Sequence, residues 1–153
     1  MKRKVKGFTL IELIIVISVI AILIGIALPR MRGMIDEGNT AKAASELRAL
    51  QAAVESYYIH NSKVYPPTGS TWETLLTTVK PTLVGSAPTD PFNNTAGTQY
   101  QYGKDTNGKY YILWSVGPDG TAGVTGVSTA GAVSGTPGDD IYVSNGTSGT
   151  GGF

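Results

Sequence analysis

The chain has 153 residues, 12 lysines and arginines against 11 aspartates and glutamates, and a mean hydropathy of +0.02. This length allows one domain with an appendage and excludes a large multidomain enzyme. The absence of cysteine excludes disulfides, CxxC redox chemistry and thiolate zinc sites, and the single histidine, His60, leaves little for an imidazole metal site.

The net charge of +1 is an average over unlike segments. Four positive charges lie in the first six residues, whereas residues 8–28 are apolar and hold one charge, Glu12. As a helix, 21 residues reach about 31 Å, enough to cross the hydrocarbon core of a membrane. The preceding lysines and arginine predict a cytoplasmic N-terminus and an exported body. The run is longer than a signal peptide requires and lacks a small-residue cleavage site after it, so we expect it to stay attached.

Glu12 is the informative residue of this segment. A carboxylate inside an apolar span costs roughly 2.5–3.5 kcal/mol at mid-helix and less near an end. Glu12 either reaches the lipid headgroups or pairs with a cation of another chain. Ionisable groups within membranes are usually partnered, which favours the second interpretation.

The motif KGFTLIEL, at residues 6–13, follows a basic leader and opens this unbroken apolar run. The combination resembles the class III signal of type IV pilins and type II secretion pseudopilins. The resemblance implies that a prepilin peptidase cuts after Gly7 and that the new amino terminus at Phe8 is N-methylated. It also implies that Glu12 neutralises the Phe8 amine of a neighbouring subunit during filament assembly.

Beyond the apolar run the pattern becomes amphipathic. We predict one helix from about residue 8 to residue 60, with its second half laid on a globular domain. Gly25 and Pro29 are its weak point, because proline lacks an N–H and clashes with the preceding turn. The resemblance implies that this stretch loses helicity inside assembled filaments. The apolar stripe of the second half comprises Leu47, Leu50, Val54, Tyr57 and Tyr58.

A β-hairpin is predicted further along the chain. Residues 99–103 and 109–116 alternate around a turn containing Asn-Gly, which supplies a positive φ. We expect Tyr111 and Leu113 on one face, Ile112 and Trp114 on the other, and one face packed on the helix stripe. A short helix is predicted over residues 71–79. The fold class is therefore α+β, with a long N-terminal helix on a small antiparallel sheet and a loop-rich C-terminus.

The predicted division of the chain has five parts. A cleaved leader over residues 1–7 precedes a transmembrane or filament-core helix over 8–29 and an amphipathic helix over 30–62. A β-rich periplasmic or extracellular domain over 63–143 follows. The glycine- and serine-rich residues 144–153 are predicted to form a flexible tail.

Asp119, Asp139 and Asp140 are the only charged residues of the C-terminal part and lie in glycine-rich turns. Such hard oxygen ligands suit calcium, although aspartate also forms ordinary turns. The segments DPFN, YQY, YYILWSVGPDG and DDI are similar to the major pseudopilins of type II secretion, which carry a C-terminal calcium loop. The resemblance implies Asp119 and Asp140 as ligands, then Asp139, Ser115 and the Leu113 carbonyl. The stretch from Asp119 to Asp139 is longer than in that pattern.

These observations predict a structural subunit without a catalytic site, a type II secretion pseudopilin that polymerises from the inner membrane to drive protein export. The expected partners are copies of itself, other pseudopilins, the prepilin peptidase and an inner-membrane assembly platform. The N-terminus would be cytoplasmic and the C-terminal domain periplasmic, or extracellular in a pilus.

The alternatives are a major or minor type IV pilin and a membrane-anchored, calcium-dependent binding module. A hydrolase using His60 with a serine would need a positioned base, which no spacing indicates. Nucleic-acid binding is disfavoured, because residues 30–153 carry 8 basic and 10 acidic side chains and no basic patch.

Overall fold

The computed structural model describes residues 7–69, 72–78, 82, 84–93, 95, 97–147 and 149–152. Residues 1–6 of the predicted leader lie outside this description, as do the side chain of Pro29 and the two ends of the predicted helix at 71–79. The chain divides into two compact units, with the boundary between Glu37 and Gly38. Each unit is described by itself.

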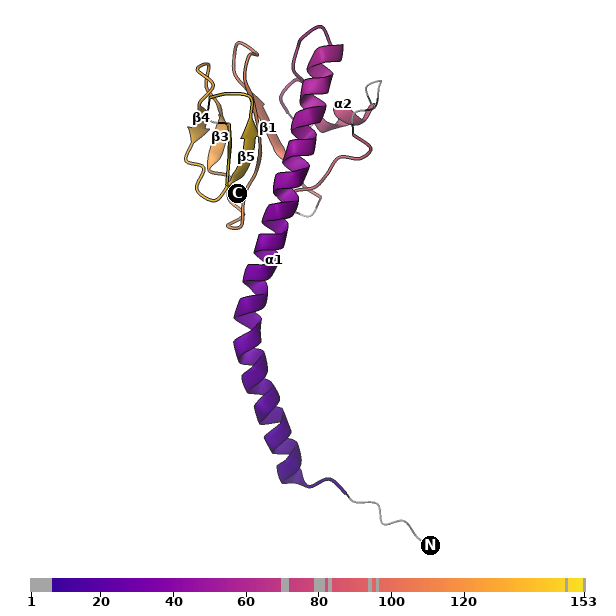
Figure 1. Cartoon of the computed structure of the whole chain (residues 1–153), viewed down its shortest axis with the longest axis vertical. Helices are drawn as coiled ribbons and strands as arrows, with labels where there is room; N and C mark the ends of the chain where they lie inside the picture. Colours follow the sequence, from indigo (N-terminus) through magenta and orange to yellow (C-terminus); the bar gives the residue numbers. More distant parts are fainter. Residues whose placement is uncertain are drawn as a thin grey trace. The chain divides into compact units, whose positions relative to one another are not determined.

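The first unit consists chiefly of the N-terminal part of α1 (Leu10–His60), which is one uninterrupted helix (Figure 1). The backbone stays helical through Gly25 and Pro29. Its most apolar 18-residue window has a mean hydropathy of 3.0, and by length and composition the helix can cross a membrane. The predicted single helix and its end near residue 60 are confirmed.

In the second unit, the remainder of α1 buries one apolar stripe. Small alanines start the stripe, and larger side chains follow at three- and four-residue steps, the spacing that places residues on one face of a helix. The predicted members Leu47, Leu50, Val54 and Tyr57 are buried, and Tyr58 is partly buried against them. This stripe is the helical half of the main core.

The other half of the main core is an antiparallel sheet of order β1-β2-β5-β6. The central hairpin joins β1 (Gln101–Lys104) to β2 (Tyr111–Ser115), and Gly108 in its turn has φ +68° as the Asn-Gly signal predicted. Strand β5 (Ile141–Ser144) pairs with the other edge of β2.

The two faces of β2 contribute to two different cores, because side chains alternate along a strand. Tyr111 and Leu113 pack with the α1 stripe, so theirs is the hairpin face that covers the helix. Ile112 and Trp114 pack on the opposite face. A second antiparallel sheet of β3 (Val124–Val127) and β4 (Val133–Gly135) covers this face with Val124 and Val127.

A short helix, α2 (Trp72–Thr78), lies between α1 and the sheet in the sequence. Trp72 stacks on Tyr102 of β1 with ring centroids 5.0 Å apart, and Leu76 is fully buried in the main core. The Leu76 carbonyl also accepts a hydrogen bond from the Val84 amide at 3.3 Å. These contacts attach α2 to the domain.

The structure corrects the expectation of a flexible tail over residues 144–153. Ser144 belongs to β5, and β6 (Thr150–Gly151) pairs with β5. Between them, Gly146 approaches the Gly131 carbonyl, and the Thr147 amide donates to that carbonyl at 2.8 Å. A composition typical of linkers is compatible with ordered structure here because these contacts need backbone groups and small residues.

Candidate functional site

At the start of α1, Thr9 and Glu12 form hydrogen bonds with each other. The Thr9 amide and hydroxyl both donate to Glu12 Oε2, at 2.9 and 2.6 Å, and the Glu12 amide donates to the Thr9 hydroxyl at 3.3 Å. This arrangement is a capping box, which satisfies amides that the first turn of a helix leaves unpaired. Sequence reasoning considered only headgroups and an intermolecular cation for Glu12 and missed this local partner.

The capping box also determines which oxygen of the Glu12 carboxylate can bind another group. Both bonds from Thr9 end on Oε2, so Oε1 accepts neither of them. Phe8, the predicted new N-terminus, is 84% exposed beside it. The carboxylate can therefore cap its own helix and present its second oxygen to another group.

The apolar side chains that follow the capping box are exposed all around α1. From Leu10 to Leu28, every large apolar side chain is about half exposed or more, and Met31, Met34 and Ile35 continue this surface. Isolated exposed apolar residues are common, but a continuous apolar surface indicates contact with lipid or protein. The N-terminal part of α1 therefore has a surface suited to contact with lipid or with other protein.

The predicted calcium ligands fall into two groups. Asp119, Asp139 and Asp140 lie together: Asp139 Oδ2 accepts a hydrogen bond from the Asp119 amide at 2.8 Å. By contrast, Ser115 donates its hydroxyl to Asp90, and Leu113 lies at the centre of the sheet.

Asp140 is the most buried of the three carboxylates. Its Oδ2 accepts hydrogen bonds from the Gly123 and Val124 amides at 2.8 and 2.6 Å, while its buried Oδ1 has no partner. Burial raises the pKa of Asp140, and the negative charges of Asp139 and Asp119 raise it further. Among the residues that the structure describes, no three acidic or histidine groups are gathered closely enough to hold a metal ion.

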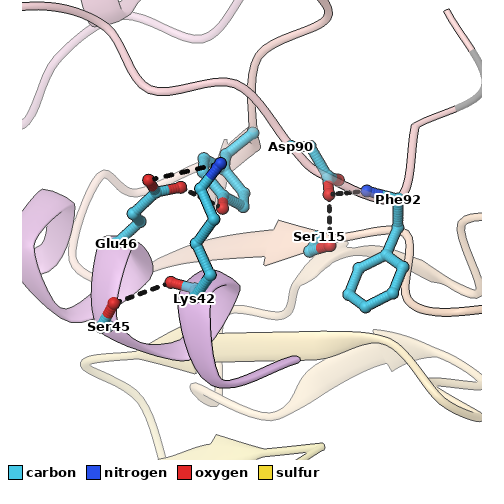
Figure 2. Close-up of polar contacts among 7 residues, drawn as sticks. Lys42, Ser45, Glu46, Asp90, Phe92 and Ser115 are labelled. Carbon is cyan, nitrogen blue, oxygen red and sulfur yellow. Dashed lines mark hydrogen bonds and ion pairs between the residues drawn. The ribbon is translucent and has the colours of Figure 1, made fainter. Parts of the chain in front are cut away.

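Asp90 is a buried carboxylate that sequence reasoning did not single out. It accepts hydrogen bonds from the Ser115 hydroxyl at 2.7 Å and the Phe92 amide at 3.0 Å (Figure 2). The Val116 amide donates a third hydrogen bond to it at 3.0 Å. Asp90 therefore ties the loop before β1 to the end of β2, where the turn leading to Asp119 begins. Its short Asp-Pro motif is the one local signal, since its partners at Ser115 and Val116 are distant in sequence.

His60, the residue considered for a hydrolase, is exposed at the end of α1. Its Nδ1 lies 2.8 Å from the Ser56 carbonyl oxygen, which is a helix-end contact. The neighbouring backbone explains the position, and nothing in this geometry orients His60 toward a serine nucleophile. His60 is therefore an exposed residue at a helix end.

The structure has a globular domain that follows an N-terminal helix able to cross a membrane, with a capping box at the start of that helix. This organisation defines the class of pilin-like subunits. Residues 2–28 match the family model described as prokaryotic N-terminal methylation motif. Residues 30–131 match the model described as Type II secretion system (T2SS), protein G.

Curated relatives agree with the family models. The Type II secretion system core protein G of Vibrio cholerae serotype O1 is 31% identical over 135 residues, 81% of this chain and 88% of that protein. The same-named protein of Pectobacterium carotovorum is 32% identical over 130 residues, 77% of this chain and 79% of that protein. That of Escherichia coli K12 is 31% identical over 132 residues, with 78% and 86% covered.

No solved structure matches the chain. The family models and relatives nevertheless cover most of it, and the chain belongs to the type II secretion system protein G family, the major pseudopilins. This is a family of structural subunits and not of enzymes, and its members assemble with other pseudopilins. The apolar helix is consistent with anchoring in the inner membrane.

Proposed function

We propose that this pseudopilin is stored in the inner membrane, with its N-terminus in the cytoplasm and its domain in the periplasm. From there it is extracted into a homopolymeric filament that drives protein export. A prepilin peptidase removes residues 1–7, and an inner-membrane assembly platform adds the processed subunit. The single observation that supports this proposal most is the continuous exposed apolar surface of α1 directly after the capping box.

The driving force follows from that surface. In the membrane, lipid tails cover the apolar side chains, and in the filament the same side chains pack against other copies of α1. Helix association in lipid gains little from hydrophobicity, so close packing and polar contacts must favour the polymer. A polar contact at the start of α1 is therefore especially valuable.

Glu12 supplies that contact in our proposal. Cleavage after Gly7 creates a positive amine at Phe8, which is N-methylated. The amine of one subunit pairs with Glu12 of its neighbour, and Oε1 is the oxygen that the capping box leaves for it. An ion pair in a low-dielectric environment is strong when both groups are hydrogen-bonded, which also fixes the register between subunits.

A set of variants separates capping from charge. Glu12→Gln keeps the side-chain oxygen that a capping box needs but removes the negative charge. Thr9→Ala disrupts the capping box and keeps the charge. We expect Glu12→Gln and Glu12→Ala to lose most filament yield, while Thr9→Ala still assembles. Filaments sheared from cells and quantified against the membrane-bound pool measure this.

Both variants should be inserted and processed like the wild type, which immunoblotting for the mature size verifies. Normal assembly of Glu12→Gln would refute a role for the charge. Loss of assembly in Thr9→Ala together with normal assembly of Glu12→Gln would indicate a capping role alone.

We further propose that the domain binds calcium through Asp119, Asp139 and Asp140. The unpartnered, buried Oδ1 of Asp140 supports this, and the negative charges of Asp139 and Asp119 add to the burial that raises its pKa. Because the three carboxylates do not form a preassembled metal cluster, calcium would have to draw the two turns together. The two glycine-rich turns also offer backbone carbonyls, and calcium accepts six to eight oxygen ligands. Bound calcium would neutralise the three carboxylates and hold the turns together. Ser115 and Leu113 remain predictions, because other contacts occupy them.

The calcium proposal is tested on the full-length protein in detergent micelles. A ligand that binds only the folded state must stabilise it, so calcium should raise the Tm and EDTA should lower it. Asp140→Asn should abolish the calcium effect, while magnesium serves as the ionic-strength control. An unchanged Tm in EDTA, or an equal calcium effect in Asp140→Asn, would count against the site.

A further inference from the structure

The short helix α2 carries a buried carboxylate that the fold leaves almost without hydrogen-bond partners. Glu73 is 1% exposed, neither of its side-chain oxygens accepts a hydrogen bond of standard geometry, and the Tyr100 backbone amide makes only a weaker contact with it. Its neighbours Trp72 and Leu76 are buried in the main core, and Glu73 is the only charged residue of α2. The carboxylate is therefore held inside the domain by the packing of α2 around it.

The titratable groups around this corner have other partners. Glu46, Asp90 and Glu73 all act electrostatically on Tyr100, whose hydroxyl donates to Glu46 Oε2 at 2.6 Å. Lys42 lies 3.9 Å from Glu46 on the exposed side of α1, and both oxygens of Asp90 already accept hydrogen bonds (Figure 2). Among the described residues, the titratable groups that share Tyr100 with Glu73 are thus acidic, and the structure shows no cation paired with Glu73 there.

We infer that Glu73 is a pH-sensitive latch, which holds α2 on the domain while it is neutral and releases α2 when it ionises. A buried carboxyl can remain in place as a neutral acid, whereas its anion needs water or a cation. Release of α2 provides the water. It would also separate Trp72 from Tyr102 and uncover Leu76.

The pKa of Glu73 agrees with this geometry. Burial raises it from 4.5 to about 8, against a smaller opposite effect of the Tyr100 backbone amide. A carboxyl with a raised folded-state pKa binds its proton more tightly in the packed state. The stability that Glu73 contributes is therefore complete below about pH 4.5 and is lost progressively as the pH rises toward 8.

Hydrogen exchange measured by mass spectrometry tests the latch on the full-length protein in detergent micelles. Peptides covering residues 72–78 are followed from pH 5 to pH 9, with rates corrected for intrinsic exchange. We expect the opening constant of α2 to rise by up to about tenfold per pH unit between pH 5 and pH 8, and to level off above. Peptides from β2 should change far less.

Two variants make the result specific to this carboxyl. Glu73→Gln and Glu73→Met cannot ionise, and the unbranched, apolar Met side chain also avoids a buried amide without partners. Both should remove the pH dependence of α2 exchange, while Glu37→Gln, at an exposed position of α1, should keep it. A wild-type exchange rate that is independent of pH, or an unchanged pH dependence in Glu73→Met, would overturn the inference.

Discussion

The two parts of α1 are made of the same secondary structure but have opposite relations to their surroundings. Before Glu37, large apolar side chains lie on all sides of the helix and all of those described are exposed. After Gly38, apolar side chains form one stripe, and the domain buries it. The first part therefore needs a partner outside the chain, whereas the second part has its partner within the chain.

The two parts of α1 therefore depend on different sources of stability. The sheet and α2 stabilise the second part of α1 through packing, so its sequence is constrained by the shape of a core. The first part gains its stability from lipid or from other subunits, so its sequence is constrained by apolarity and by Glu12. A mutation in the first part should affect assembly, and a mutation in the second part should affect folding of the domain.

Replacing a leucine by alanine in each part tests whether the two parts of α1 are stabilised differently. Leu47 is fully buried and Leu23 is 61% exposed. Leu47→Ala should lower the free energy of unfolding by about 2–5 kcal/mol, because it removes buried area and leaves a cavity. Leu23→Ala should leave it unchanged within about 0.5 kcal/mol. Thermal unfolding in micelles, followed by near-ultraviolet circular dichroism, measures both.

Filament yield provides the complementary measurement for this pair. Leu23→Ala should reduce assembly while the domain stays folded. Equal destabilisation of the domain by the two substitutions would show that the two parts of α1 are not independent in this sense.

The next largest effect concerns the acidic turns of the domain. Gly117 has φ +69°, and a Cβ there would lie 2.3 Å from the Asp139 carbonyl oxygen. Gly117→Ala combines a left-handed backbone, which costs about 1–2 kcal/mol, with a clash that costs about 1–3 kcal/mol. We expect the free energy of unfolding to fall by about 2–5 kcal/mol in urea titrations.

Gly108→Ala is the matched control for this prediction. Gly108 has nearly the same φ, +68°, but open space around its Cα. Gly108→Ala should therefore show only the cost of the left-handed backbone. A similar loss in the free energy of unfolding for both variants would show that the Gly117 Cα does not lie close to the Asp139 carbonyl.

The parts of the fold that could be predicted carry strong periodic or turn signals. The stripe of α1 repeats at helical spacing, and the β1–β2 hairpin has Asn-Gly at its turn. The β3–β4 sheet was not predicted, because glycine, serine and threonine give no alternating apolar pattern. Backbone contacts build it instead, such as the 3.0 Å hydrogen bond from the Thr136 amide to the Gly123 carbonyl.

The functional residues divide in the same way. Gly7, Phe8 and Glu12 form a local motif that a sequence can reveal. The positions of Asp90 and Glu73 depend on contacts and burial that arise on folding, from residues distant in the sequence. No local sequence pattern predicts a carboxylate inside a core.

The smallest expected effect concerns the domain end of α1, which is the counterpart of the capping box at the other end. The Lys63 amide donates to the Tyr58 carbonyl at 3.0 Å, and Ser62 has φ +54°, the geometry of a Schellman motif with serine where glycine is usual. Ser62→Gly should raise the free energy of unfolding by roughly 0.5–1 kcal/mol, since relief of the left-handed strain exceeds the added entropy of the unfolded chain. Ser45→Gly, inside the helix, should lower it by about 0.5 kcal/mol. Equal signs for the two variants in chemical denaturation would mean that the end of α1 is not held by this motif.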